Sequence, residues 1–212
     1  LGLSVFIMQA SESVISVCFN RSLQNYGGDL AVGAMTILTS VMQFAMLPLQ
    51  GLGQGAQPII SYNYGARNAE RVKAAFKLLL KASLCYACLL WVLVMLFPQV
   101  FAAMFTSDAE LLEFTRTALR IYMACMLLFG IQMACQMTFT SLGNAKASIL
   151  VAVMRKFILL IPLIYILPLF FRSNQTMAVY LAEPVADFLA VSFTAVLFTF
   201  QFKKSMKSLS NT

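Results

Sequence analysis

The sequence predicts an all-α membrane protein in which six helices cross the bilayer. Its residues are 60% hydrophobic and 11% charged, whereas soluble domains average about 45–50% and about 25%. The mean hydropathy is +0.82. Six apolar segments are long enough to span about 30 Å of hydrocarbon, where a helix satisfies its own backbone hydrogen bonds. They cover residues 1–19, 30–52, 82–97, 121–142, 149–171 and 177–202, and residues 1–212 are expected to form one transmembrane unit.

The first segment is expected to cross the membrane and not to be a cleaved signal peptide. No basic region precedes its apolar run, no small-residue cleavage site follows it, and Gln9 and Glu12 lie within it. Since the chain begins at Leu1, already apolar and without an initiator methionine, we expect it to be a fragment of a longer protein.

The distribution of positive charge predicts the orientation of the helices. The net charge is +7, but the basic residues flank the apolar segments instead of forming a soluble module, so no nucleic-acid partner is expected. If loops alternate between the two sides, eleven of the 15 lysines and arginines fall together. Only Arg21, Arg116, Arg120 and Arg172 fall on the other side. Cytoplasmic loops carry the excess of Lys and Arg, which predicts that both chain ends are cytoplasmic.

The residue types argue against an enzyme. The chain has no histidine, and its five cysteines lie in apolar segments, including the pair Cys85 and Cys88. Neither a zinc site nor a Ser/His triad is expected from such residues. A membrane-embedded transferase would need paired metal-binding acids at one membrane surface, and this spacing does not occur. We therefore expect no enzyme, no cofactor and no firm metal site.

Polar side chains recur at helical spacing in three of the apolar segments. The stripes are Gln9, Ser13, Ser16 and Asn20; Thr36, Ser40, Gln43, Gln50, Gln54 and Gln57; and Gln132, Gln136 and Thr140. They predict a polar cavity between helices, although hydrogen bonds between packed helices would explain single Ser and Thr residues. With adaptable Met and aromatic neighbours, the expected lining is Gln9, Ser16, Asn20, Gln43, Phe44, Gln132, Met133 and Gln136.

Glu12 is the first candidate for cation or proton coupling. It lies about 11 residues into its segment, or about 16 Å at 1.5 Å per residue, which is near the bilayer midplane. An ionised carboxylate there costs about 2.5–3.5 kcal/mol on insertion scales. Glu12 is therefore expected to exchange a proton or to bind a small cation. The alternative is a neutral Glu12 that is bonded to Gln9 or to a neighbouring helix.

Glu183 and Asp187 are further coupling candidates, four residues apart on one face of the last segment and beside Pro184. Glu183 is expected to be the wetter of the two, because it lies nearer the outer surface. Asp187 either takes part in coupling or has a structural role, in which it pairs with Arg155 or caps a broken helix. Lys156 is expected to extend to the cytoplasmic surface.

The stretch PLQGLGQGAQPIISYNYGARN, residues 48–68, combines glycine, glutamine and proline at the end of an apolar segment. Its alternating glycines do not form a phosphate-binding motif. Glycine allows helices to approach closely and proline removes a helix hydrogen bond, so the stretch predicts a hinge at the cytoplasmic mouth. Proline is also expected to help end the span. The residues assigned to this hinge and its turn are Pro48, Gly51, Gly53, Gly55, Pro58, Asn63, Gly65 and Arg67.

Four motifs resemble those of the multidrug and toxic compound extrusion (MATE) transporters, in a bacterial branch of that family. Residues 51–73, GLGQGAQPIISYNYGARNAERVK, resemble the end of the family's eighth helix and the following loop. Residues 105–108, 143–146 and 183–187 resemble the segment before helix ten, the ten-to-eleven turn and part of helix twelve. In the first of these, Ser107 or Asp108 is expected to cap a helix. The resemblance covers the whole chain.

The resemblance implies a fold and a function. The chain would be the C-terminal lobe, helices 7–12, of a twelve-helix transporter in the bacterial inner membrane, with membrane lipid and the N-terminal six-helix lobe as partners. Such proteins exchange cationic or amphipathic organic compounds, including drugs, for protons or sodium ions by alternating access. Glu12 matches a helix-seven glutamate that the sodium-coupled branch uses. That branch also uses a helix-ten aspartate, where this chain offers Gln132 and Gln136, so a proton is favoured over Na⁺ near Glu12.

Two other functions stay open. A lipid-linked oligosaccharide flippase of related architecture would favour a larger and more cationic groove, which only Arg155 approaches in the sequence. A non-transporting structural subunit of the membrane would bind a separate chain without moving a solute.

Overall fold

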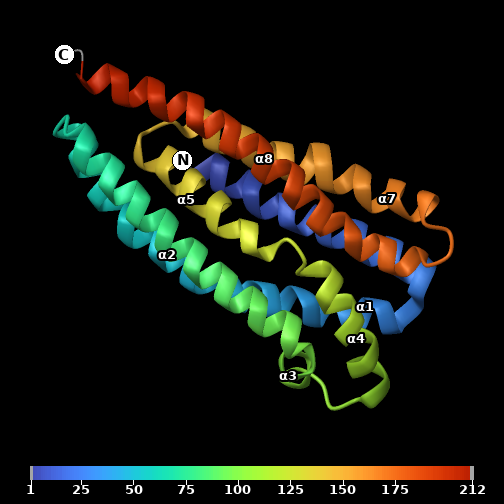
Figure 1. Ribbon diagram of the computed structural model, residues 1–212. Coiled ribbons are helices and arrows are strands. Elements are labelled where there is room, and N and C mark those ends of the chain that lie inside the picture. The colour runs from blue at the N-terminus through green and yellow to red at the C-terminus, as the bar shows by residue number, and fades with distance from the viewer. Residues whose placement is uncertain (1, 211–212) are drawn as a thin grey trace.

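The computed structural model describes the backbone of residues 2–210 and the side chains of residues 11–144 and 146–209. Across residues 2–210 the chain is helical and contains no strand. In chain order the elements are α1 (Gly2–Gly65), α2 (Ala69–Leu96), α3 (Pro98–Ala103), α4 (Ala109–Tyr122), η1 (Met126–Leu128), α5 (Phe129–Ser141), α6 (Ala145–Val153), η2 (Met154–Leu160), α7 (Ile161–Phe170) and α8 (Gln175–Ser210). The long helices run roughly along one axis (Figure 1).

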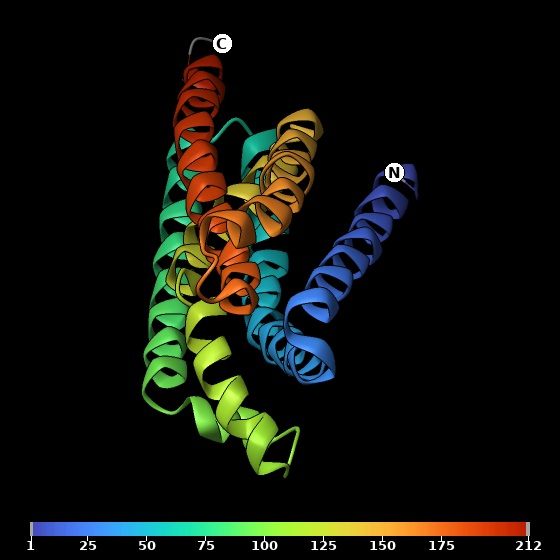
Figure 2. The same ribbon diagram turned by 90° about the vertical axis from the view of Figure 1, so that its right-hand side faces the viewer.

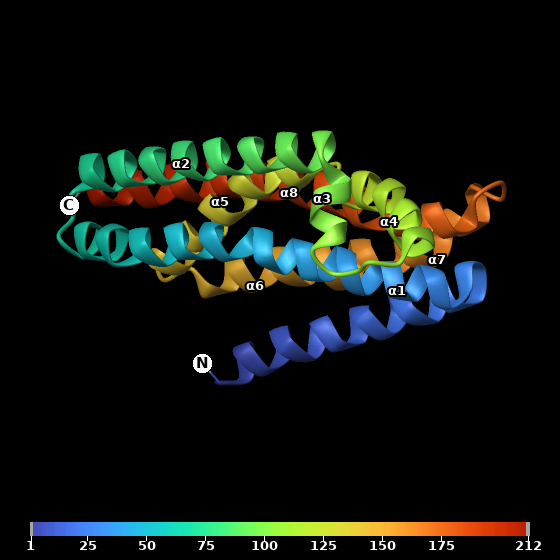
Figure 3. The same cartoon turned by 90° about the horizontal axis from the view of Figure 1, so that it is seen from below.

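Helix α1 consists of two arms that meet at Gly28. This residue has φ 64° and ψ −158°, a backbone region that essentially only glycine occupies. A straight helix of 64 residues would be about 96 Å long, three times the thickness of the hydrocarbon core. Instead, the first arm runs to the bend and the second arm returns beside it, while the first diverges from the other helices (Figures 2 and 3). α1 therefore supplies two crossing segments.

Four helical stretches in the described part of the chain are long and apolar enough to cross a membrane. They cover residues 11–65, 69–96, 146–170 and 175–209. A fifth arises if α4 and residues 126–141, which are bent by 45°, form one broken span. Counting the arms of α1 separately gives six crossing segments. The predicted all-α membrane fold with six transmembrane helices is confirmed.

The broken span between α4 and α5 begins at a well-formed cap. The Asp108 carboxylate accepts hydrogen bonds from the backbone N–H groups of Glu110 and Leu111, at 2.9 and 3.2 Å, as the sequence predicts. The helix is then interrupted between α4 and α5, within the predicted 121–142 segment. Lipid offers no partners for such a break, and the protein supplies one, because the Trp91 indole donates a hydrogen bond to the Ala124 carbonyl at 2.8 Å.

The glycine- and proline-rich stretch is continuous helix as far as Gly65. The expectation that Pro58 helps to end the span is wrong, because a proline removes only one backbone donor and membrane helices tolerate that loss. The turn comes later, where Arg67 has φ 55°. Only Gly53 shows the expected close approach, since a Cβ there would lie 2.6 Å from Met137. A role of this stretch as a hinge stays a prediction.

The other assigned residues of this stretch lie as follows. Pro48 is inside α1, and a Cβ at Gly51, Gly55 or Gly65 would meet no atom within 4 Å. The Asn63 side chain donates a hydrogen bond to the Ile59 carbonyl at 2.8 Å. The Asn63 hydrogen bond therefore stays within α1.

Within the described residues, three clusters of buried side chains hold the helices together. The largest joins both arms of α1 to α4, α7 and α8 through buried side chains that include Phe19, Leu38, Leu119, Ile164 and Tyr180. The Tyr180 hydroxyl also donates a hydrogen bond to the Ala31 carbonyl, at 2.7 Å, just after the Gly28 bend. Another cluster includes the neighbouring aromatic rings of Phe76, Phe139, Phe198 and Phe202. Helix α8 thus stabilises the Gly28 bend, and the first arm of α1 projects from this bend.

Candidate functional site

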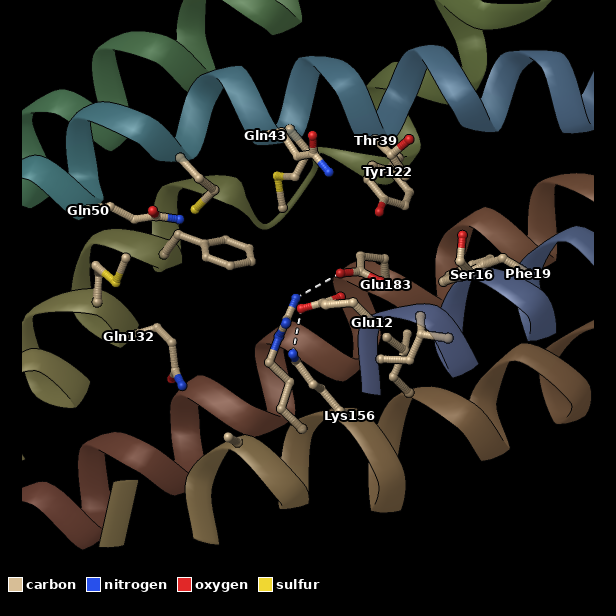
Figure 4. A pocket seen from close by; sticks show the side chains of 18 of the residues that line it. Glu12, Ser16, Phe19, Thr39, Gln43, Gln50, Tyr122, Gln132, Lys156 and Glu183 are labelled. Carbon is tan, nitrogen blue, oxygen red and sulfur yellow. Dashed lines mark hydrogen bonds and ion pairs between the residues drawn. The ribbon is translucent and has the colours of Figure 1, made fainter. Parts of the chain in front are cut away.

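A cavity of about 620 Å³ lies between both arms of α1 and the helices α4, α5, α6, η2 and α8. Its wall carries four charged side chains from three elements, Glu12, Arg155, Lys156 and Glu183. Glu12, Lys156 and Glu183 lie close together in Figure 4. Around them the wall is formed by glutamine amides and by apolar side chains, among them four methionines. A polar cavity between helices is what the stripes predicted.

The structure brings together five of the eight side chains that were expected to line this cavity. Ser16, Gln43, Gln132, Met133 and Gln136 lie on its wall. Phe44 does not, because consecutive residues of a helix point about 100° apart, and its side chain is exposed on another face.

Asn20 is one helical turn beyond Ser16 and is exposed outside the wall. The side chain of Gln9 lies outside the described part of the chain.

Several wall residues were missed by the sequence analysis. Met35, Thr39 and Met42 continue the line of Gln43 and Gln50 along the second arm of α1. Their spacing follows the same helical repeat, so extending the stripe to apolar residues would have found them. Tyr122 and Phe19 also lie on the wall, and neither carries a sequence signal for this position.

Arg155 binds both acidic residues of α8. Its Nε donates to Asp187 Oδ1 at 2.6 Å, and its Nη2 donates to Glu183 Oε1 at 2.7 Å. The guanidinium also lies over the Phe129 ring, 5.1 Å from the centroid, a distance at which cation–π attraction operates. The pairing of Asp187 with Arg155, one of the two predicted structural roles, is present.

The expectation that Glu183 is the wetter of the two acids holds only by a small margin, because both are buried. The side chain of Glu183 is 7% exposed and that of Asp187 is 3% exposed. Residues four apart share one helix face, and this face of α8 packs against η2. Glu183 is therefore buried with its neighbour, whatever its position along the membrane normal.

Lys156 pairs with Glu12, 144 residues away in the sequence, with Nζ and Oε1 2.5 Å apart. The Lys156 side chain is 11% exposed, whereas that of Glu12 is 61% exposed. The expectation that Lys156 extends to the cytoplasmic surface is wrong, since its ammonium points into the cavity wall (Figure 4). The pair therefore joins a buried cation to a carboxylate that is open to the cavity.

A local change of helix type explains why Arg155 and Lys156 both face the cavity. Residues 154–160 form a π-helix, in which the Ile161 N–H donates to the Lys156 carbonyl five residues back. Pro162 follows and lacks an N–H to donate, so this wider turn accommodates a donor that an α-helix would miss. A π turn holds more residues than an α turn, and consecutive side chains consequently point in closer directions.

This arrangement suits an amphipathic solute with one positive charge. Among the described residues, three carboxylates and two cations meet here, so the ionised group carries one net negative charge. Methionines and Phe129 give the wall an adaptable apolar surface. The described residues hold no group of three or more His, Cys, Asp or Glu side chains placed for a metal ion. A sodium ion near Glu12 stays a prediction.

Comparison with known proteins decides the family. The model of the MatE family matches residues 4–166, which is most of the chain. This chain belongs to the MATE family. Curated relatives include the Multidrug export protein MepA of Staphylococcus haemolyticus, 24% identical over 192 residues, and that of Staphylococcus aureus, 24% identical over 198 residues. These matches confirm the resemblance to a bacterial branch of the family.

The MATE relatives are longer than this chain. The alignments cover 90% and 93% of the chain but only 42% and 43% of the two MepA proteins. Solved structures give the same proportion. A MATE transporter in the bent conformation matches with a TM-score of 0.89 and 18% identity, over 99% of the chain and 46% of that structure.

Outward-facing and inward-facing MATE structures also match, with TM-scores of 0.85 and 0.86 and 20% and 19% identity, over 46% and 48% of their length. The chain thus has the fold of about half of a MATE transporter.

Proposed function

We propose that this chain is the second six-helix lobe, helices 7–12, of a MATE transporter that exports cationic or amphipathic organic compounds in exchange for protons or sodium ions. Membership of the family and the multidrug export named in its relatives support this proposal. The half-length match supports a partner lobe with the same general architecture. Matches to both inward- and outward-facing structures of other MATE proteins support alternating access.

The observation that carries the proposal is Glu12 on the cavity wall. Its side chain is 61% exposed and borders a cavity of about 620 Å³, so a solute in the cavity has direct access to it. Carboxylates at membrane depth are costly, and those that persist mark ion and substrate pathways. Glu12 is the acid of the site that offers a solute such access, whereas Glu183 and Asp187 are both held by Arg155.

In the proposed cycle, Glu12 alternates between a cationic solute and the coupling ion. A proton or Na⁺ taken up by Glu12 from outside neutralises its charge and weakens its hold on the solute. Release of that ion towards the cytoplasm restores the negative charge. One charge that moves through 100 mV is worth about 2.3 kcal/mol, which is enough to bias the cycle. Glu183 and Asp187 contribute by fixing Arg155 beside Glu12.

The proposed orientation places the α1–α2 turn, the α5–α6 turn and the C-terminus on the cytoplasmic side of the bacterial inner membrane. These three features lie at one end of the molecule (Figure 1). The excess of Lys and Arg near them supports this assignment through the positive-inside rule.

Replacement of Glu12 tests the proposal. In inverted membrane vesicles that contain the whole reading frame carrying this chain, Glu12→Gln should abolish proton- or sodium-driven uptake of a lipophilic fluorescent cation. Glu113→Gln is the matched control, because Glu113 forms an exposed pair with Arg116 outside the cavity; its uptake should equal that of the wild type. Unchanged uptake in Glu12→Gln, with normal membrane insertion, would remove Glu12 from the mechanism.

One observation favours the flippase alternative more than the sequence did. Lys156 as well as Arg155 lies on the cavity wall, so the groove is more cationic than expected. Each cation is paired with a carboxylate, however, and an anionic lipid-linked sugar would have to displace those pairs. The same vesicles separate the functions, since a flippase would move a lipid-linked oligosaccharide and not the cation, and a structural subunit would move neither.

A further inference from the structure

Lys156 stands out because it offers Glu12 the same partner that a cationic solute would offer. Within the described residues its ammonium has one ion-pair partner, Glu12. We propose that Lys156 is a tethered counterion that occupies Glu12 when the cavity is empty, so that a cationic solute binds only by displacing it. This inference rests on the proposed function of the cavity and assigns Lys156 as a residue that sets affinity and specificity.

The geometry explains why a solute can displace Lys156 from Glu12 but not Arg155 from its two carboxylates. Arg155 donates through two different nitrogens to two carboxylates and also lies over Phe129. A guanidinium fork of this kind is rigid and directional, whereas a lysine ammonium is a point charge on a flexible stem. The contact of Lys156 is with a single carboxylate that faces the open cavity, where attraction is weaker than in a buried pair. Lys156 is therefore the cation that a solute displaces.

A displaced Lys156 has another carboxylate beside it. Glu183 lies next to Glu12 and faces the same cations (Figure 4). The bond from Arg155 engages one oxygen of Glu183, Oε1, and a carboxylate accepts several hydrogen bonds through its two oxygens. A short rotation of the flexible lysine stem towards Glu183 would keep the ammonium paired. The exchange thus avoids an isolated buried charge, which would be costly.

The charge count then sets what kind of solute fits. With Lys156 retained and all five charged side chains of the site ionised, the site carries one net negative charge. A solute with one positive charge brings the net charge of the site to zero. An anion would find both Arg155 and Lys156 already paired with carboxylates. Competition with a tethered cation also keeps the affinity low, which suits a step in which the solute has to leave again.

Removal of the lysine charge should therefore tighten binding. The experiment measures the Kd of tetraphenylphosphonium by equilibrium dialysis, with the purified whole protein that contains this chain. Lys156→Met, which keeps the apolar stem and removes the competitor, should bind the probe about tenfold more tightly or better, a gain of about 1.4 kcal/mol. Lys156→Arg keeps a competing positive charge on a more rigid donor and is the matched control, so its Kd should be equal to or higher than that of the wild type.

The double variant Glu12→Gln/Lys156→Met identifies the partner of the probe. If Lys156 acts by occupying Glu12, the gain seen in Lys156→Met disappears when Glu12 is neutral. A purely structural lysine would not produce this pattern, because loss of a structural contact weakens binding and does not strengthen it. Lys156→Gln provides a second neutral side chain if the methionine variant fails to fold, and it should shift the Kd in the same direction.

The outcomes separate this inference from the proposed function. An equal or larger Kd in folded Lys156→Met or Lys156→Gln, with measurable binding by the wild type, overturns the tethered counterion and leaves the transport proposal standing. A gain that persists in the double variant also overturns it, since Glu12 would then not be the contested group. Absence of binding in the wild type and in both folded neutral variants overturns the transport proposal together with this inference.

Discussion

Arg155 and Lys156 are consecutive residues of η2, yet their ion pairs differ in number, in burial and in access to the cavity. Arg155 joins η2 to α8 through two bonds among side chains that are 17% exposed or less. Lys156 joins η2 to the first arm of α1 through one bond to an open carboxylate. The difference teaches that charge at membrane depth has two uses in one site. The two Arg155 pairs fix a helix interface, and the Lys156 pair leaves a charge available to a solute.

The largest effect is expected from removing Arg155, which forms the buried ion pairs. Arg155→Met would leave Glu183 and Asp187 without the cation that binds them both. Breaking a buried pair costs about 3–5 kcal/mol, so the free energy of unfolding should fall by that amount in equilibrium unfolding in mixed detergent micelles. Arg155→Lys is the control and should lose less, because it keeps the charge. A loss under 1 kcal/mol in Arg155→Met would show that the carboxylates do not depend on Arg155.

The next effect concerns the bend from which the Glu12 arm projects. Gly28→Ala forces an L side chain into a backbone region that only glycine adopts readily, at a cost of about 1–3 kcal/mol. Gly51→Ala, where a Cβ would meet no atom within 4 Å, is the control and should be neutral or stabilising by up to about 1 kcal/mol. Thermal unfolding of both variants in one detergent gives the comparison. Equal melting temperatures of Gly28→Ala and Gly51→Ala would mean that the bend accepts a side chain without strain.

A smaller effect is expected at the bond that ties α8 to the bend. Tyr180→Phe removes the buried hydroxyl that donates to the Ala31 carbonyl at 2.7 Å. A net hydrogen bond contributes about 0.5–1.5 kcal/mol, and the unfolding free energy should fall within that range. Tyr62→Phe, at an exposed tyrosine, should cause no change. A loss in the control equal to that in Tyr180→Phe would assign the effect to hydroxyl removal in general.

The smallest stability effect is expected at Glu12 itself. Its pair with Lys156 is open on the carboxylate side, and exposed pairs contribute about 0–1 kcal/mol. Glu12→Gln should therefore change the unfolding free energy by under about 1 kcal/mol, although it is expected to abolish export. The same unfolding assay as for Arg155→Met applies. A loss as large as that of Arg155→Met would mean that both pairs are structural and that the contrast between them fails.

Local chemistry made part of the fold predictable. Hydropathy and segment length gave the six crossing segments, because lipid imposes the same requirement on each helix separately. The cap at Asp108 was predictable because its hydrogen bonds reach only two and three residues along the chain. Helical spacing likewise placed Gln43, Gln132 and Gln136 on one cavity.

Helix ends and burial were predicted less well than the crossing segments. The bend of α1 at Gly28 falls between the predicted segments 1–19 and 30–52, but α1 continues through both of its prolines. Depth along the membrane placed Glu183 nearer to water, yet its side chain is only 7% exposed. Its actual burial depends on which helix covers that face of α8.

The sequence by itself determined that this chain spans a membrane through helices with polar stripes, since hydrophobicity and helical period are properties of consecutive residues. Only the tertiary structure decided which charges meet. Glu12 and Lys156 are 144 positions apart, and the π turn before Pro162 directs Arg155 and Lys156 into one cavity. Pairing at such distances depends on the packing of whole helices, and no local pattern records it.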